Sequence, residues 1–266
     1  MTKLGIIGAM QEEVETLLAL MENKKELHKA GSVFYEGVLE GLDVVIVQCG
    51  VGKVNAAMCT QVLCDLFDVT HIVNTGIAGS LCADLDIGDL VVSRDAMYHD
   101  VDAVHFGYPF GKVPGMDTTE FPADETMIGY AYSASEAVNP GHTRIGRVAS
   151  GDQFVAVKEL KEKIITVTGG LCTEMEGAAI AQTAYRNQVP FVILRAISDK
   201  ADDSAQMDYP TFERIAAHRC AEVTRSLARQ LRSIYIANVG RRQASAGHHQ
   251  HLSVYSVCSG FETARR

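Results

Sequence analysis

Four short polar segments follow apolar runs in this 266-residue chain, and three of them carry carboxylates. The segments are Gly8–Glu13, Asn74–Gly79, Ser150–Phe154 and Arg195–Asp199. Ligands of open α/β sheets bind beyond the carboxyl ends of the strands, so these segments are the first candidates for chemistry. One carboxylate that activates water and one carboxylic acid that protonates the leaving group can break a glycosidic bond. An N-glycosidic bond to a purine needs the same pair, with the acid directed at a ring nitrogen.

Each carboxylate also has a purely structural interpretation, and spacing alone leaves both open. Glu13 would favour the positive N-terminal end of a helix dipole. Glu174 and Glu176 would be first-turn acids of a helix over 174–185, where their spacing of two lets only one of them face a cleft. Asp199 would cap a short helix over 200–204. As a carboxyl at the end of a buried strand, it would alternatively have a raised pKa that suits a general acid.

The first turn argues against a dinucleotide site. Gly5 and Gly8 lack the G-x-G-x-x-G spacing, and Gln11–Glu13 stands where a pyrophosphate would need bare backbone amides. Negative charge at this turn disfavours phosphate.

Short β-rich runs alternate with segments of helical periodicity, which predicts the elements that position these residues. Gly41 supplies the turn of an expected hairpin, and residues 98–125 are predicted to form a long Gly/Pro/aromatic-rich loop that serves as a lid or an interface. We expect strands over 3–7, 33–39, 43–49, 71–74, 87–93, 144–149 and 191–197. We expect helices from 12 onward, over 54–66 (apolar positions Val54, Ala57, Met58, Val62 and Leu66), over 174–185 and over 209–231. The pattern favours an α/β fold, a three-layer αβα sandwich with a central mixed, twisted sheet.

Composition narrows the class of partner. The formal charge of −9 disfavours nucleic acid and anionic membrane surfaces, which leaves small molecules and proteins. Seven cysteines without a C-x-x-C pair indicate reduced thiols and a cytoplasmic protein. We expect no signal peptide and no membrane span.

The C-terminal tail differs from the body. Residues 237–266 hold four arginines and one glutamate, a net of +3, which leaves −12 on residues 1–236. We therefore expect one folded domain over 1–236 and a disordered basic, His-containing tail over 237–266. His248, His249 and His251 could bind a metal, but the polar composition favours a solvated tail.

Eight motifs in order resemble the 5′-methylthioadenosine/S-adenosylhomocysteine nucleosidases of the nucleoside phosphorylase superfamily. The resemblance spans about residues 3–232 and rests on Gly5–Glu13 (GIIGAMQEE), Gly50–Ala57 (GVGKVNAA), Asn74–Gly79 (NTGIAG), Tyr98–Asp100 (YHD), Phe106–Tyr108 (FGY), Ser150–Asp152 (SGD), Glu174–Glu176 (EME) and Arg195–Asp199 (RAISD).

The resemblance implies three catalytic carboxyl groups. Glu13 would activate the attacking water, Glu176 would bind the ribose hydroxyls and support a cationic transition state, and Asp199, oriented by Ser198, would protonate adenine N7. Arg195 would lie near the ribose and the water.

The remaining implied substrate contacts form a pocket around the nucleoside. Met175 would lie beneath the sugar, Phe154 would stack on adenine, and the backbone of Val155 would bind its N1 and N6 edge. Ile77, where some members carry Ser, would be a wall residue. Met10, Val51 and Tyr209 would line the rest.

The implied reaction is hydrolysis of the N-glycosidic bond of 5′-methylthioadenosine and S-adenosylhomocysteine, with 5′-deoxyadenosine a further candidate. Adenine and a 5′-thio-ribose would be released in methionine salvage and methyl-cycle recycling, with no cofactor and no metal. A homodimer is implied, in which Phe106, Tyr108 and Pro114 reach the 5′ pocket of the neighbouring subunit.

Three alternatives remain open at this stage. A purine nucleoside phosphorylase would use phosphate, which the carboxylates of the first turn disfavour. A futalosine-type nucleosidase could use the same residues. A non-catalytic nucleoside sensor would have no need of all three carboxyl groups.

Overall fold

The structure is a computed structural model and describes residues 2–202 and 205–252. Its strands belong to one mixed sheet. They are β1 (Lys3–Gly8), β2 (Glu22–Lys29), β3 (Ser32–Leu39), β4 (Leu42–Gln48), β5 (His71–Ser80), β6 (Leu90–Tyr98), β7 (Phe121–Pro122), β8 (Thr143–Ser150), β9 (Cys172–Glu174) and β10 (Phe191–Asp199).

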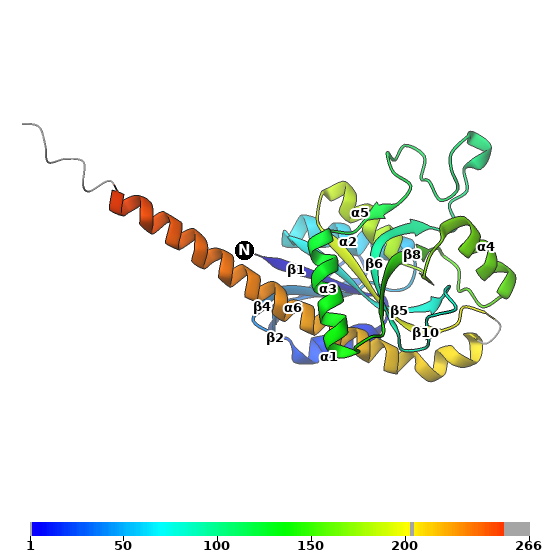
Figure 1. Cartoon of the computed structure of the whole chain (residues 1–266), viewed down its shortest axis with the longest axis horizontal. Coiled ribbons are helices and arrows are strands. Elements are labelled where there is room, and N and C mark those ends of the chain that lie inside the picture. The colour runs from blue at the N-terminus through cyan, green and yellow to red at the C-terminus, as the bar shows by residue number, and fades with distance from the viewer. Residues whose placement is uncertain (1, 203–204, 253–266) are drawn as a thin grey trace, which may run out of the picture.

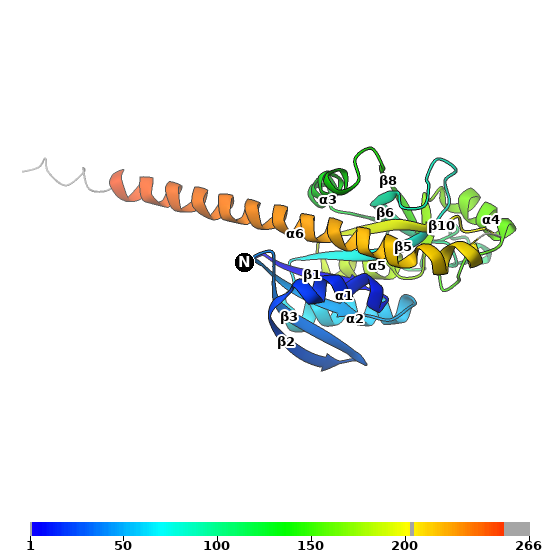
Figure 2. The same cartoon turned by 90° about the horizontal axis from the view of Figure 1, so that it is seen from below.

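Helices cover both faces of this sheet, as the two orientations of Figures 1 and 2 show. They are α1 (Gln11–Leu20), α2 (Lys53–Phe67), α3 (Glu125–Val138), α4 (Lys158–Thr168), α5 (Gly177–Asn187) and α6 (Ala205–Leu252), with one 3₁₀ turn at Val104–Phe106. The apolar residues of α1, α3 and α6 form a core with one face of the sheet, and those of α2 and α5 form a core with the other. The predicted three-layer α/β sandwich is confirmed.

The sheet closes partly on itself. Its order is β10-β6-β8-β9-β5-β1-β4-β3-β2, and β10 also pairs with β5 in parallel. Five strands (β5, β9, β8, β6 and β10) therefore form a ring, while β1 to β4 extend it to one side. Closure brings the ends of β5, β9 and β10 together at one rim, although residues 80 and 199 are far apart in the sequence.

The hairpin between β3 and β4 forms as expected. Glu40 and Gly41 adopt left-handed backbone conformations with φ of 53° and 76°, which suit a two-residue turn between twisted strands. Glu40 also holds α6, because its carboxylate accepts hydrogen bonds from Arg225 and Arg229. The hairpin is thus anchored to the longest helix.

Several elements differ from the sequence-based expectation. Strand β5 continues through 75–80, beyond the expected end of this strand at residue 74. The edge strand β2 and helices α3 and α4 were not predicted. The eight residues of β2 are all exposed and mostly charged, so this strand has no apolar alternation by which it could be recognised.

Helix α2 presents a different face to the core than its apolar residues predict. Its buried residues are Ala56, Cys59, Thr60, Leu63 and Phe67. Val54, Met58 and Leu66, expected on the core side, are 69 %, 41 % and 52 % exposed. The helix carries two apolar stripes, and the sequence could not tell which of them packs on the sheet.

Helix α6 passes through the boundary expected near residue 236 and continues to Leu252. Its first part packs on the sheet as far as Leu231, and its orange end projects away from the body in Figure 1. Residues 237–252, expected to be disordered, are helical as a continuation of this packed segment. Residues 253–266 lie outside the described residues, and the division of the chain near 236 stays a prediction. No helix in the described ranges is both long and apolar enough to cross a membrane.

The contact of Glu40 with α6 predicts a pH-dependent part of the stability. Hydrogen bonds from Arg229 and then Arg225 lower the pKa of Glu40 from 4.5 to about 2. The stabilisation is therefore complete above pH 4.5 and is lost as the pH falls through 2. We expect Glu40→Gln to lower the free energy of unfolding by about 1 kcal/mol at pH 7. Denaturant titrations should show the two proteins converging toward pH 2. Glu26→Gln on the exposed strand β2 is the control, and an equal effect of both changes would contradict the role of Glu40.

Candidate active site

A cavity open to solvent lies at the rim where the closing strands end. The cavity is lined by Ala9, Met10, Glu13, Val51, Ile77, Ala78, Gly79, Phe154, Thr173, Glu174, Met175, Glu176, Ser198, Asp199 and Tyr209. The lining combines four carboxyl groups with apolar and aromatic side chains, so it can hold a ligand that is part polar and part apolar.

Glu13 enters the cavity from the first turn of α1. Its Oε2 accepts hydrogen bonds from the backbone N–H groups of Ala9 (2.6 Å) and Met10 (3.0 Å), and its Oε1 accepts one from Ile77 (3.1 Å). The carboxylate therefore caps the turn, as the structural interpretation expected, and lines the cavity as well. Burial raises the pKa of Glu13, while the charge of Arg195 and the three amides oppose this rise.

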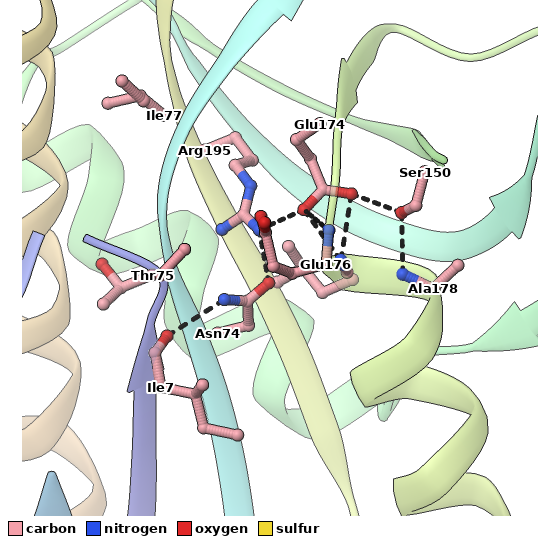
Figure 3. Close-up of polar contacts among 12 residues, drawn as sticks. Ile7, Asn74, Thr75, Ile77, Ser150, Glu174, Glu176, Ala178 and Arg195 are labelled. Atoms are coloured by element: carbon pink, nitrogen blue, oxygen red, sulfur yellow. Dashed lines mark hydrogen bonds and ion pairs between the residues drawn. The ribbon is translucent and has the colours of Figure 1, made fainter. Parts of the chain in front are cut away.

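Glu174 and Arg195 form a buried ion pair behind the cavity (Figure 3). Arg195 also donates to the side chain of Asn74, which itself donates to the carbonyl of Ile7 on β1. Glu174 accepts hydrogen bonds from the Ser150 hydroxyl. The network thus joins strands β1, β5, β8, β9 and β10.

The same carboxylate caps helix α5. Glu174 accepts hydrogen bonds from the backbone N–H groups of Glu176 (3.2 Å) and Gly177 (2.8 Å). The expected helix over 174–185 is therefore wrong at its start, because Glu174 ends strand β9 and α5 begins at Gly177. Both Glu174 and Glu176 line the cavity, and the expectation that only one could do so fails because neither lies on a helix.

Glu176 lines the cavity and is held by the segment that precedes helix α2. Its Oε1 accepts a hydrogen bond from the backbone N–H of Gly52 (2.8 Å), just before α2. Burial and the charge of Glu174 raise the pKa of Glu176 to about 8, against the opposing effects of Arg195 and the Gly52 amide.

Asp199 ends strand β10 at the far side of the cavity. Its Oδ2 accepts a hydrogen bond from the Ser198 hydroxyl (2.8 Å), and its Oδ1 accepts one from the backbone N–H of Ala201 (2.8 Å). Burial raises the pKa of Asp199, and these two hydrogen bonds oppose the rise. A carboxyl group of this kind suits proton donation.

Aromatic side chains form the outer wall. The ring of Phe154, 51 % exposed, meets the edge of Tyr209 with centroids 5.5 Å apart, and the Tyr209 hydroxyl donates to Met10 Sδ at 3.2 Å. Val155 lines a smaller adjoining cavity together with Phe154 and Asp199. These residues provide a flat apolar surface beside a carboxyl group.

Most of the predicted site residues meet in this cavity. Ten of them line it: Met10, Glu13, Val51, Ile77, Phe154, Met175, Glu176, Ser198, Asp199 and Tyr209. Val155 lines the adjoining cavity, and Arg195 lies behind the wall. Phe106, Tyr108 and Pro114 line neither cavity.

Sequence reasoning missed the supporting contacts. Asn74 and Ser150 each belong to a polar segment after a strand, which indicates their place near the site but not their contacts. No pattern points to Thr173, since a single threonine in a short strand has no distinguishing feature. Among the residues that the structure describes, no cluster of three His, Cys, Asp or Glu side chains is placed to hold a metal ion.

The buried ion pair predicts a large loss of stability when one partner is removed. Arg195→Met leaves the Glu174 carboxylate buried without its cation, which should cost about 3–5 kcal/mol of unfolding free energy. Adding Glu174→Leu should recover much of this loss, because the orphaned charge is then gone. Denaturant unfolding of the single and double variants measures both effects. A single-variant loss below about 1 kcal/mol would contradict the assigned electrostatic role.

Comparisons with known proteins agree on one family. The family model of the phosphorylase superfamily matches residues 3–229. The chain is 42 % identical over 235 residues to the 5′-methylthioadenosine/S-adenosylhomocysteine nucleosidase of Halalkalibacterium halodurans, covering 87 % of this chain and 100 % of that protein.

Solved structures give the same result. The Neisseria meningitidis 5′-methylthioadenosine/S-adenosylhomocysteine nucleosidase in complex with methylthio-immucillin-A superimposes with a TM-score of 0.84 at 36 % identity, covering 86 % of this chain and 100 % of that chain. The futalosine hydrolase of Helicobacter pylori superimposes with a TM-score of 0.82 at 33 % identity, covering 86 % and 98 %. The chain described here belongs to the 5′-methylthioadenosine/S-adenosylhomocysteine nucleosidase family of the phosphorylase superfamily.

Proposed function

We propose that this protein hydrolyses the N-glycosidic bond of 5′-methylthioadenosine and S-adenosylhomocysteine and releases adenine. The observation that carries the proposal is the meeting of Glu13, Glu176 and Asp199 around one cavity with an aromatic wall. Family membership supports the same reaction, since the relatives carry this name. The reaction would serve methionine salvage and recycling of the methyl cycle, and 5′-deoxyadenosine is a further candidate substrate.

Glu13 is the proposed base that positions and deprotonates the attacking water. Three backbone N–H groups support its carboxylate form, and they fix its orientation toward the cavity. The proton taken from water can remain on Glu13, because burial raises the pKa of this carboxyl group. Arg195 lies within the electrostatic reach of Glu13 and limits this rise.

Asp199 is the proposed acid that protonates adenine N7. A protonated purine leaves as a neutral base, so the positive charge stays on the ribosyl carbon. Burial raises the pKa of Asp199, which favours the protonated form that the acid role requires. The hydrogen bond from Ser198 to Oδ2 supports the proposed orientation of the carboxyl group.

Glu176 is proposed to bind the ribose hydroxyls and to stabilise the developing cation. Burial raises the pKa of Glu176 in the free protein, but a developing positive charge beside it favours its ionised form. A negative group in a water-poor cavity stabilises such a charge more strongly than solvent does. Met175 is proposed to lie beneath the sugar, and Ile77 to serve as a wall residue whose backbone N–H holds Glu13. The deep part of the cavity thereby suits a ribosyl group.

The aromatic wall is proposed to receive adenine and the 5′ substituent. Phe154 would stack on the base, and the backbone of Val155 would bind its N1 and N6 edge. Met10, Val51 and Tyr209 would contact the rest of the nucleoside. The exposure of Phe154 in the free protein supports this assignment, because the ring is open to a stacking partner.

Water is the proposed nucleophile rather than phosphate. The first turn carries Glu12 and Glu13, and Ile77 offers no hydroxyl, so this wall disfavours a phosphate ion. We expect the purified protein to release adenine from 5′-methylthioadenosine at an unchanged rate in phosphate-free buffer. Adenine release followed by chromatography with and without phosphate measures this. Strict dependence on phosphate would identify a phosphorylase instead.

A futalosine-type nucleosidase remains the second candidate. The structural similarity to the futalosine hydrolase of Helicobacter pylori favours it specifically. Turnover of 5′-methylthioadenosine, S-adenosylhomocysteine and futalosine under one set of conditions ranks the three substrates.

The acid role of Asp199 predicts a separation of binding from turnover. Asp199→Asn keeps the shape of the side chain and removes the transferable proton, so turnover should fall by about 10²-fold or more. Nucleoside affinity should change little. Single-turnover rates and calorimetric binding measure the two effects, with the exposed Asp86→Asn as control. Full turnover in Asp199→Asn would remove this residue from its role.

A homodimer is proposed to complete the site. Phe106 is 85 % exposed, and Tyr108 and Pro114 line neither of the two cavities described above, which supports their reaching a neighbouring subunit. The exposed apolar stripe of α2, with Val54 and Met58, supports a second contact surface. The six cysteines within the described ranges are all free, which supports a reducing compartment such as the cytoplasm.

The dimer proposal is tested by sedimentation. We expect a mass of twice 28.8 kDa for the wild type and a shift toward monomer in Met58→Glu, because the charge would be buried in the interface. Ile215→Glu, on an exposed apolar position of α6, is the matched control and should leave the mass unchanged. A monomeric wild type would contradict the proposal.

A further inference from the structure

A buried hydroxyl group in the wall of the cavity has no hydrogen-bond partner. Thr173 lies in strand β9 and is 5 % exposed. Its Oγ1 finds no partner among the described residues. Buried hydroxyl groups of native proteins are generally hydrogen-bonded, so an unpaired one at a ligand cavity calls for an explanation.

The neighbouring strands cannot supply that partner. Thr173 stands opposite Gly79 on β5 and opposite Ala149 on β8, and neither of these residues has a polar side-chain atom. The adjacent Glu174 is engaged with Ser150 and Arg195. The unpaired hydroxyl is therefore a consequence of the sheet register.

Gly79, the residue paired with Thr173 on β5, leaves no room for a side chain of its own. A Cβ atom on Gly79 would lie 2.8 Å from Asp199 Oδ1, so a larger residue would collide with this carboxyl group. Thr173, Gly79 and Asp199 line both the main cavity and the smaller cavity beside Val155. Thr173 thus stands at the end of the cavity that the proposed function assigns to the base.

We propose that the Thr173 hydroxyl is a specificity-determining group that forms a hydrogen bond with the adenine base of the bound nucleoside. The inference rests on the proposed function, which places the base between Phe154, Val155 and Asp199. A hydroxyl group can donate to a ring nitrogen or accept from the exocyclic amine, and adenine offers both kinds of partner. The bound base would satisfy the polar atom that the sheet leaves unpaired.

Two variants separate this role from a structural one. Thr173→Val keeps the side-chain shape and removes the hydroxyl, whereas Thr173→Ser keeps the hydroxyl. Thr143→Val, at a buried threonine of β8 outside both cavities, is the matched control. Adenine itself is the probe, and its affinity is measured by calorimetry alongside the thermal stability of each free protein.

We expect the loss of the hydroxyl to weaken adenine binding without lowering the stability of the free protein. Thr173→Val should bind adenine about tenfold more weakly, while its free form should be at least as stable as the wild type, because an unpaired buried polar group is gone. KM for the nucleoside should rise by a similar factor with kcat little changed, since base contacts made before and during the reaction affect binding alone. Thr173→Ser and Thr143→Val should bind adenine like the wild type.

Two results would overturn the inference. One is adenine affinity in Thr173→Val within twofold of the wild type, and the other is equal loss of affinity in Thr173→Ser. If Thr173→Val does not fold, the hydroxyl has a structural role, and this outcome also counts against the inference. Failure of the proposed function itself is distinguishable, because the wild type would then neither release nor bind adenine.

Discussion

The buried guanidinium of Arg195 is the interaction on which the arrangement of the site depends. Removing a carboxylate from water costs several kcal/mol, and this cavity wall holds Glu13, Glu174 and Glu176 close to one another. Arg195 pairs directly with Glu174 and lowers the pKa values of Glu13 and Glu176 below what burial alone would produce. Arg195 thereby favours the ionised forms of carboxyl groups whose pKa values burial raises.

The same ion pair has a structural consequence. Glu174 caps α5 through two backbone amides, binds Ser150 of β8 and pairs with Arg195 of β10. Charge balance and the closure of the sheet are therefore coupled, because the Glu174–Arg195 ion pair that balances the charge of the site also ties its strands together. Glu13, Glu176 and Asp199 each use backbone amides or a neighbouring hydroxyl for orientation, so the main chain fixes their directions. Around this network, the Thr173 hydroxyl and Arg195 Nε have no hydrogen-bond partner among the described residues.

Much of the fold could be predicted from local patterns. The apolar runs of β1, β4 and β10 and the Gly41 turn gave clear signals, since buried strands and tight turns have strong residue preferences. Strand β2 escaped prediction because all of its side chains are exposed and most are charged. The core-facing side of α2 escaped prediction because this helix carries two apolar stripes. Residues 174–176 were predicted to begin a helix, but Glu174 ends strand β9 and α5 begins at Gly177. A strand of three residues is too short to show an alternating pattern.

The sequence alone was sufficient for the residue types of the site and for the motifs that indicate the family, since these depend only on order along the chain. It indicated that carboxyl groups follow several strands, and most of the residues singled out do line one cavity. The tertiary structure decided which carboxyl groups face one another, which of them Arg195 neutralises, and which hydroxyl is left without a partner. These properties depend on distances across the closed sheet between residues up to 186 positions apart, from Glu13 to Asp199, and the pKa of a buried group depends on such distances rather than on its neighbours in sequence.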